Sequence, residues 1–417
     1  MNVYDEYKAK CCSADEAVKI VKDGDWVDYS MSCAYPTALD KALGRRHAEL
    51  KDIKVRNAIS CHPVAILEAD PENKTFTYNL WHCSGVDRQY LDAGRAYHEP
   101  MLFRDCGSYY RRGFAPVNVA MITVSPMDKQ GNFSFGLTNG CQQEMLDAAE
   151  HIIVEVNPKM PTVFGMGNDH IHVSNVTAVV ESDEAVSLAP NREPTDIDKE
   201  IAGKIFPYLH DGITLQLGIG GMPNALGILI AESDLKDLGM HTELMSDGYL
   251  NLYKAGKITN DKKPLHRGKG VFSICMGSQE LYDFLDHNQD ILSAPMYYVN
   301  NPETIRQLDD FISINSCIAV DLYGQVCSES AGTRHISGTG GQLDFVTGAT
   351  LLNTAKLLSH AVQPRRPQRK TPFQHPAEIY GRRHHHDAAD PGAIHRHRIR
   401  CGQPVRSCHL AAGRSLD

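Results

Sequence analysis

The sequence predicts an α/β protein with two similar open α/β domains and the active site between them. Short apolar runs alternate with helical patterns, an order that favours largely parallel sheets covered on both faces. A polar stretch with two prolines, SLAPNREPTD, interrupts this order at 187–196. The segment 314–332 repeats the order of 117–136, with an apolar strand, a polar turn containing glycine and a second strand. We therefore expect domains at 1–186 and 197–358, joined by a linker at 187–196.

The first domain is expected to begin with a short helix. Ser13 and Glu16 fit a capping box, and the sequence AVKIVKDG then predicts a helix that stops near Gly24. WVDYSM follows as a predicted strand. Residues 117–136 predict two strands around the turn KQG, and HIIVEVN at 151–157 predicts another buried strand.

The second domain is expected to begin with a capped helix, a strand, a glycine turn and another helix. Thr195 can cap the first helix, and three residues spaced at i, i+4 and i+8 predict its buried face: Ile197, Ile201 and Ile205. DGITLQL predicts a strand that ends in the turn GIGG, residues 218–221. Pro223 is expected to open the next helix, and Glu243 to lie at the end of a second short strand.

The composition is that of an ordinary globular protein with a basic end. Of 417 residues, 42% are hydrophobic, no apolar run predicts a membrane helix, and the N-terminus lacks an apolar signal core. The twelve cysteines form no CxxC pair, so we expect reduced thiols in a cytoplasmic protein and no metal site. Residues 361–417 carry 11 basic and 4 acidic side chains, and the rest of the chain carries 31 and 47. The basic end is thus attached to an acidic body.

Residues 359–417 do not continue the α/β pattern. Positions 361–417 contain six prolines and only nine Val, Ile, Leu, Phe or Tyr residues, without a sustained period. We expect an atypical basic tail that is disordered, and a second domain that is truncated. A nucleic-acid or membrane arm would account for the charge, but the tail has no aromatic interleaving and no amphipathic face, so neither partner is expected.

The tail sequence also fits a metal-binding histidine cluster or a shift of the reading frame. Nothing in the spacing of the tail histidines fixes a coordination geometry: His384, His385, His386, His395 and His397. We favour a frame shift near residues 357–361, because sequence rich in Arg, His and Pro is typical of a GC-rich gene translated out of frame.

The glycine turn at 218–221 is a candidate ligand site. It is not a dinucleotide-binding GxGxxG, because Pro223 occupies the third glycine position, and the chain has no P-loop. Glycines without side chains let backbone N–H groups approach an anionic or acyl ligand. A ligand-free turn between strand and helix is the alternative.

Carboxylates provide the candidate chemistry. Glu243 follows apolar residues at a predicted strand end, and ligands of open α/β sheets bind beyond the carboxyl ends of strands. Glu329 is a rival nucleophile in a second cluster, where His335 could be a base or a structural histidine. That cluster also contains a possible backbone cradle: Gly338, Gly340 and Gly341. No GxSxG motif supports a serine triad.

Four ordered motifs give a more specific indication. LQLGIGGMPNAL, ESDLKDLGMHTELMSDG, DLYGQVCSESAG and SGTGGQLDFVTGA resemble the acetyl-CoA hydrolase/transferase family, with the nearest likeness to butyryl-CoA:acetate and 4-hydroxybutyrate CoA-transferases. The resemblance covers about residues 4–357. It implies that Glu243, rather than Glu329, is the nucleophile.

The resemblance also implies where CoA binds. The loop formed by Gly220, Gly221, Met222, Pro223 and Asn224 matches the family's CoA-binding loop, and Ile318 and Gly341 match further CoA contacts. The acyl pocket is expected among first-domain residues, near Trp81 and His82 or near Gln89 and Tyr90.

The implied reaction is transfer of CoA from a short-chain acyl-CoA, preferably butyryl-CoA, to a carboxylate such as acetate. CoA is then a substrate and forms a covalent glutamyl thioester, and no permanent cofactor or metal is needed. A 4-hydroxybutyrate CoA-transferase, an acetyl-CoA hydrolase and an inactive CoA-binding protein are the alternatives. The sequence leaves a homo-oligomer open.

Overall fold

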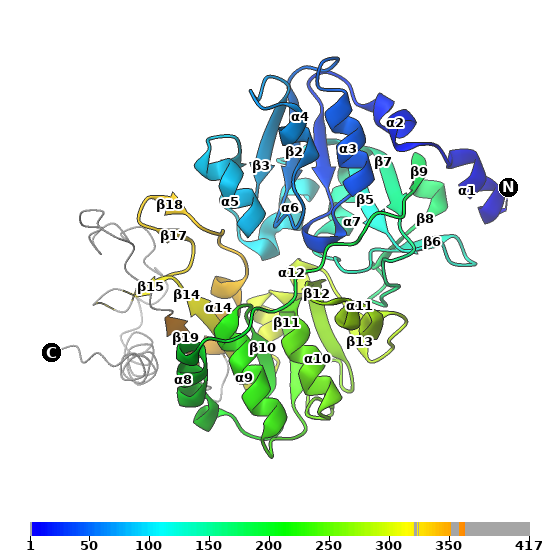
Figure 1. The fold of residues 1–417 in the computed structure, drawn as a ribbon. Helices are drawn as coiled ribbons and strands as arrows, with labels where there is room; N and C mark the ends of the chain where they lie inside the picture. Colours follow the sequence, from blue (N-terminus) through cyan, green and yellow to red (C-terminus); the bar gives the residue numbers. More distant parts are fainter. Residues whose placement is uncertain (1, 321–322, 324, 352–357, 363–417) are drawn as a thin grey trace.

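The computed structural model describes residues 2–320, 323, 325–351 and 358–362. It contains two domains, each built on a parallel sheet with helices on its faces (Figure 1). The predicted fold class is therefore confirmed. Buried apolar strands form the centre of each sheet, since nearly every residue of β5 and every residue of β12 is buried.

The first sheet has the strand order β4-β3-β2-β1-β5-β7-β9, and all its neighbours are parallel. Its strands are β1 Trp26–Tyr29, β2 Ile53–Asn57, β3 Phe76–Leu80, β4 Tyr97–His98, β5 Val117–Val124, β7 Ala149–Val156 and β9 Ala178–Glu181. The helices of this domain are α1 Val3–Lys10, α2 Ala14–Ala17, α3 Thr37–Arg45, α4 Ala65–Ala69, α5 Gly85–Asp92, α6 Cys106–Arg111 and α7 Gln142–Ala148.

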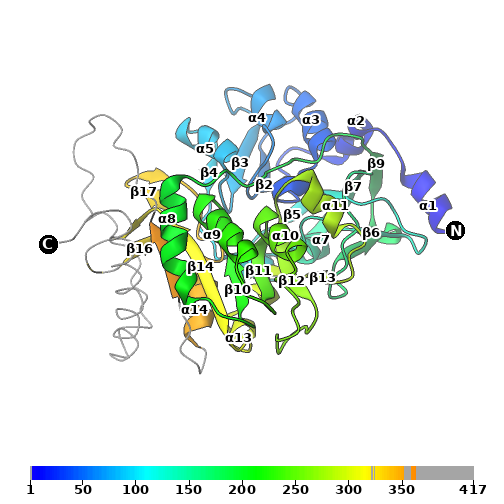
Figure 2. The ribbon, with the colours of Figure 1, turned by 60° about the horizontal axis from the view of Figure 1, so that its bottom comes forward.

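The second sheet has the parallel order β13-β12-β11-β10-β14-β19. Its strands are β10 Thr214–Leu217, β11 Gly239–Met245, β12 Gly270–Cys275, β13 Ile291–Ser293, β14 Phe311–Cys317 and β19 Leu358–Val362. Its helices are α8 Asp196–Ile205, α9 Gly221–Glu232, α10 Asp247–Lys254, α11 Gln279–Leu285, α12 Met296–Val299, α13 Pro302–Ile305 and α14 Gln342–Thr350. Figure 2 shows α8, α9 and α10 side by side along one face of this sheet.

Short antiparallel ladders and single turns of 3-10 helix complete the described chain. The ladders pair β6 Asn132–Ser134 with β8 His170–His172, β15 Ala319–Val320 with β16 Val326–Cys327, and β17 Ser330–Ala331 with β18 Arg334–His335. The 3-10 turns are η1 Val18–Ile20, η2 Ser32–Ala34, η3 Phe103–Asp105, η4 Val173–Asn175 and η5 Phe206–Tyr208.

The two sheets have the same topology. In chain order, β1 to β4 are added on one side of the first sheet, and β5, β7 and β9 follow on the other side. The second sheet grows in the same way, with β10 to β13 on one side and β14 and β19 on the other. The repeated segments 117–136 and 314–332 contain the equivalent strands β5 and β14. The predicted similarity of the two domains is therefore confirmed.

The domains meet through backbone hydrogen bonds and a shared apolar cluster. The segment 137–140 of the first domain runs antiparallel to β12, with Cys275 N–H donating to Leu137 O at 2.8 Å and Asn139 N–H to Ser273 O at 3.0 Å. Three second-domain side chains belong to a core cluster of the first domain: Leu244, Ile274 and Met296. This contact fixes the ends of β11 and β12 against the first domain.

Several local predictions need correction. The first predicted helix is shorter, because α2 passes into η1 and ends at Ile20 rather than near Gly24. Ser13 does accept the Glu16 N–H, at 3.2 Å. Thr195 caps α8 as predicted, with Asp198 completing the capping box, but Ile197 is 43% exposed and does not belong to the buried face.

The expected start of the tail at residue 359 falls within a strand. Leu358–Val362 forms β19, which pairs in parallel with β14 from Ser313 to Cys317. Four residues of the expected tail therefore belong to the second sheet. Residues 363–417, on which the rest of the tail prediction falls, lie outside the described residues.

Candidate active site

The glycine turn connects β10 to α9. Gly220 has φ +120°, a backbone conformation that favours glycine. A Cβ on Gly221 would collide with the Asp198 carboxylate of α8 and would lie 2.9 Å from the Arg192 guanidinium. No side chain caps α9, so its first N–H groups have no side-chain acceptor. The turn is therefore a backbone surface suited to an anionic or acyl group.

Glu243 lies on β11, the strand next to β10. The two strands pair in parallel, Thr214 with Gly239 and Leu215 with Met240, and both the glycine turn and Glu243 follow this pairing toward the carboxyl ends of the strands. Adjacent strands are about 4.8 Å apart. The sequence predicted that Glu243 lies at the end of its strand. β11 continues to Met245, so Glu243 lies within the strand instead.

The Glu243 side chain is held by groups from distant parts of the chain. The Asn300 amide, fully buried at the end of α12, donates a hydrogen bond to Glu243 Oε2. His241, two residues before Glu243, is paired through Nε2 with Val299 O at 2.8 Å and so fixes the end of α12. Burial raises the pKa of Glu243 to about 7, although the Asn300 hydrogen bond lowers it.

A second buried carboxyl group accompanies Glu243. Asp344, in the first turn of α14, is fully buried, and Arg104 Nη1 lies 2.9 Å from its Oδ1. Burial raises the pKa of Asp344 to about 8. The Arg104 charge opposes this rise, and the Glu243 charge adds to it. The site thus combines two carboxyl groups that both tend to hold a proton near neutral pH.

The loop before α14 closes the site from the other side. A Cβ on Gly341 would overlap both the Glu243 carboxylate and the Asn300 amide. The first domain holds this loop, because Phe103 N–H donates to Gly340 O at 3.3 Å and Cys83 N–H to Ser337 O at 3.2 Å. Glu243 therefore lies where the two domains meet.

A small cavity in the first domain has room for about one water molecule. It is lined by Tyr29, Met31, Arg56, Asn57, Ala58, Trp81, Tyr110, Cys141, Gln142 and Met145. The Cys141 thiol hydrogen-bonds to that of Cys106, whose pKa is raised first by burial, then by Cys141 and also by the Glu243 charge. The cavity therefore borders a thiol pair on which the Glu243 charge acts.

Two family models match this chain. The model of the acetyl-CoA hydrolase/transferase N-terminal domain matches residues 1–190, and that of the acetyl-CoA hydrolase/transferase C-terminal domain matches residues 277–369. The chain belongs to the acetyl-CoA hydrolase/transferase family.

Individual members of the acetyl-CoA hydrolase/transferase family resemble this chain in sequence and in structure over most of their length. A probable butyrate:acetyl-CoA coenzyme A-transferase of Syntrophomonas wolfei is 47% identical over 346 residues, or 83% of this chain and 77% of that protein. The butyryl-CoA:acetate CoA-transferase of Anaerostipes caccae is 44% identical over 358 residues, which cover 85% of this chain and 80% of that protein. The crystal structure of RipA from Yersinia pestis has a TM-score of 0.78 at 31% identity, covering 87% of this chain and 83% of that chain.

The residues that the resemblance assigned to CoA binding lie at the same edge of the second sheet. The side chains of Met222 and Pro223 are buried, and Asn224 Nδ2 donates to Arg192 O at 3.1 Å, so this loop offers its backbone rather than its side chains. Ile318 directly follows β14, and β14 also receives the Gly218 N–H at Ile314 O, 2.8 Å away.

The other cluster predicted from the sequence is hydrogen-bonded within its own loop. The backbone carbonyl of Glu329 accepts N–H bonds from Ile336 and Ser337 at 2.9 and 3.2 Å, and Thr339 Oγ1 donates to its carboxylate at 3.3 Å. Glu329 thus shapes the loop that carries Gly341. His335 lies on β18 and pairs through Nε2 with Ser337 O at 2.6 Å.

Sequence reasoning missed Asn300, Asp344 and Arg104. Asn300 precedes a helix-start pattern, NPET, in which the next residue, Asn301, caps α13. Asp344 lies within the motif SGTGGQLDF, and its place three residues after Gly341 was the available signal. Arg104 carries no local signal, because only the fold brings η3 beside α14.

Within the described residues, no helix is both long and apolar enough to cross a membrane.

Proposed function

We propose that this protein is an acyl-CoA:carboxylate CoA-transferase that moves CoA from butyryl-CoA to acetate, with Glu243 as nucleophile. The observation that carries the proposal is the placement of Glu243. Its carboxylate lies at the domain junction, beside Gly341, on the strand next to the one that leads into the glycine turn, and is oriented by Asn300. The substrate pair is supported by the two relatives named for butyrate and acetate.

The reaction follows from covalent catalysis by a carboxylate. The ionised Glu243 attacks the butyryl thioester carbonyl, the C–S bond breaks, and a mixed butyryl-glutamyl anhydride and CoA thiolate result. The thiolate then attacks the glutamyl carbonyl, which forms a glutamyl-CoA thioester and releases butyrate. Acetate repeats the two steps in reverse order and leaves as acetyl-CoA. Thioester energy is conserved throughout, so the reaction needs no ATP.

The glycine turn and α9 are proposed to supply binding and charge stabilisation. Each attack produces an oxyanion. A preorganised backbone N–H donor that stabilises this oxyanion accelerates the reaction by about 10²–10³-fold. The long CoA moiety offers binding energy that can orient the thioester against Glu243. Gly220, Gly221, Ile318 and Gly341 contribute backbone positions to this surface.

The acyl chain is proposed to enter the cavity beside Met31 and Met145. Its present size accommodates one water, so a butyryl chain requires these flexible side chains to move. Trp81 lines this cavity, as expected for the acyl pocket. His82, Gln89 and Tyr90 are not among its lining residues.

The test is to trap the glutamyl-CoA intermediate. Incubation with butyryl-CoA in the absence of an acceptor is expected to add the mass of CoA to the protein at Glu243, and borohydride is expected to reduce the thioester. Glu243→Gln is expected to abolish the adduct and lower exchange by about 10³-fold or more. Glu329→Gln is the matched control, since it keeps an acceptor for Thr339 and is expected to keep the adduct.

Persistence of the adduct in Glu243→Gln, or its absence from a folded wild-type protein that binds CoA, would overturn the assignment of the nucleophile. Thioester loss with and without acetate separates a transferase from an acetyl-CoA hydrolase. A panel of acids separates butyrate from 4-hydroxybutyrate. Tight CoA binding without exchange would identify an inactive CoA-binding protein.

Two further properties belong to this proposal. A protein that exchanges CoA between short-chain acids acts where these metabolites are, so a cytoplasmic location is proposed and is testable by fractionation. Whether the protein forms a homo-oligomer is testable by light scattering of the purified chain.

A further inference from the structure

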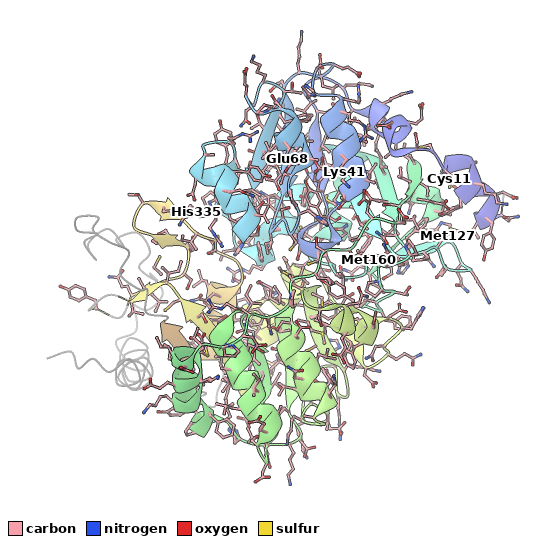
Figure 3. All side chains as sticks on the ribbon, in the orientation of Figure 1. Cys11, Lys41, Glu68, Met127, Met160 and His335 are labelled. Atoms are coloured by element: carbon pink, nitrogen blue, oxygen red, sulfur yellow. The ribbon has the colours of Figure 1, made fainter. Side chains whose placement is uncertain are left out.

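Three metal-binding side chains meet at the edge of the first sheet. Cys83, His98 and His335 each place one ligand atom within 4.8 Å of the other two, and they form the one such cluster of three or more in the described part of the chain. Cys83 follows β3, and His98 ends β4, the edge strand. His335 comes from the second domain, on the hairpin β17–β18, which Figure 3 shows beside α5.

One backbone carbonyl links two of the three residues. The carbonyl of Ser337 accepts the Cys83 N–H at 3.2 Å and pairs with His335 Nε2 at 2.6 Å. A histidine that binds a metal commonly donates its other ring N–H to a carbonyl, which fixes the tautomer. The hydrogen bond at Nε2 leaves Nδ1 of His335 as the ring nitrogen with a lone pair. The His98 ring lies against the His335 ring, with centroids 3.8 Å apart.

From this geometry we propose that Cys83, His98 and His335 bind one Zn²⁺ ion or a closely related divalent transition metal between the two domains. One sulfur and two imidazole nitrogens are typical zinc ligands, and three protein ligands leave the fourth tetrahedral position to water. The Zn–N and Zn–S bond lengths place neighbouring ligand atoms roughly 3.3–3.7 Å apart. The ligand atoms lie within 4.8 Å of one another, and binding is expected to bring them to this spacing by side-chain rotation.

The Cys83 thiol must lose its proton before a metal ion can bind to its sulfur. Burial raises the pKa of the Cys83 thiol to about 12, the nearby Asp87 charge adds to it, and a metal ion must displace this proton to bind the thiolate. Each bound ion therefore releases one proton from Cys83. This metal site is distinct from the Glu243 site and was not expected from the cysteine spacing, because its ligands are far apart in the sequence.

The bound ion would add a further link between the hairpin and the first domain. Arg88 Nη1 already donates to Ile336 O at 2.7 Å, and Arg334 Nε already contacts Asp92 Oδ1 at 3.0 Å. All three links lie just before the loop that carries Gly341. A cation at this position is therefore expected to stabilise the domain junction.

The test is a titration of the full chain with Co²⁺, which reports thiolate ligation by a sulfur-to-metal charge-transfer band. The tail contains Cys401 and Cys408 and several histidines, so every variant carries Cys401→Ser and Cys408→Ser. One equivalent of Co²⁺ is expected to produce the band, one equivalent of Zn²⁺ to remove it, and metal to raise the unfolding temperature. Cys83→Ser is expected to abolish the band and to weaken binding at this site by at least about 100-fold.

Two further pairs of variants make the result decisive. His335→Ala and His98→Ala change the band or remove it, and circular dichroism verifies that each variant is folded. Cys12→Ser and His287→Ala are matched controls. Cys12 lies by β9, at the opposite edge of the sheet, and the side chain of His287 is exposed. Absence of a thiolate band in the folded parent, or a band that survives Cys83→Ser, would exclude the proposed site.

Discussion

Burial and the Asn300 amide act on the Glu243 carboxylate in opposite directions. Burial favours the protonated acid, and the amide N–H stabilises the carboxylate that the proposed attack requires. With a pKa of about 7, Glu243 is ionised in roughly half of the molecules at neutral pH. Its basicity exceeds that of an ordinary glutamate, which favours nucleophilic attack once the proton has left.

Asn300→Ala is expected to move the acidic limb of the kcat/KM profile to higher pH. The variant removes a hydrogen bond that lowers the pKa of Glu243, so a higher pH is needed to ionise the nucleophile. The measurement is the rate of CoA exchange across the range from acidic to alkaline pH. Asn301→Ala is the control, because it removes the cap of α13, costs about 1 kcal/mol of stability and leaves Glu243 untouched. An unshifted limb in Asn300→Ala would contradict this role.

Asp344→Asn is expected to flatten the dependence of stability on pH. The pKa of Asp344 rises on folding from its ordinary 3.8 to about 8, so the folded state holds a proton that the unfolded state has lost. Stability from this group is therefore present below about pH 4 and is lost as the pH rises to about 8. The loss is on the order of 2–5 kcal/mol.

Urea unfolding of wild type and Asp344→Asn at about pH 5 and about pH 8 measures this difference. Asp105→Asn is the control, since Asp105 also faces Arg104, at 3.6 Å, from a more exposed position. Equal pH slopes in wild type and Asp344→Asn would show that Asp344 is ionised in the folded protein.

At the scale of elements, the junction of β10, the glycine turn and α9 depends on helix α8. Gly221 lies against Asp198, which also completes the capping box of α8 with Thr195. The start of α9 can therefore approach α8 only without a Cβ at this position. The same contact fixes the N–H groups that are proposed to receive CoA.

Gly221→Ala is expected to raise the KM for acyl-CoA about tenfold or more, because the added methyl group must displace Asp198 or the first turn of α9. Gly203→Ala in α8 is the matched control. A Cβ there meets no atom within 4 Å, and alanine in a helix is expected to add about 0.5–1 kcal/mol of stability. Steady-state kinetics with varied butyryl-CoA provide the measurement. An unchanged KM in a folded Gly221→Ala would separate this turn from CoA binding.

Local sequence patterns predicted the helices and strands. Contacts between distant segments determined which side chains meet in the site and which are exposed. The strand, glycine turn and helix around Gly218 follow from neighbouring residues, so the sequence was sufficient for them. Asn300 and Glu243 are 57 residues apart and meet only because α12 packs at the end of β11. No periodicity or capping signal contains that information. The exposure of Ile197 has the same origin, since an i, i+4 pattern does not specify which residue is left uncovered.

At the scale of the whole molecule, the matching strand order of the two sheets identifies where they differ. β19 occupies in the second sheet the place that β7 occupies in the first, and β9 then follows β7 as an edge strand. The described part of the second sheet ends at β19. The C-terminal family model continues to residue 369, so family-like sequence extends past the expected tail start.

A frame shift would account for the sequence that follows β19. Because residues 358–362 form β19 in the present frame, a frame shift is expected after β19 rather than at residues 357–361. Translation of the other two frames downstream of β19 is expected to restore an alternation of strands and helices, including a segment resembling VTEYG. In the equivalent position of the first domain, β9 covers the edge of β7, and an uncovered strand edge favours association between chains. The restored protein is therefore expected to unfold at a higher temperature, to aggregate less and to exchange CoA faster than the 417-residue chain. Thermal unfolding, light scattering and butyryl-CoA:acetate exchange of the two proteins provide the comparison. If neither frame restores the pattern, or if the 417-residue chain is soluble, unfolds cooperatively and is as active as the restored protein, the tail is native sequence.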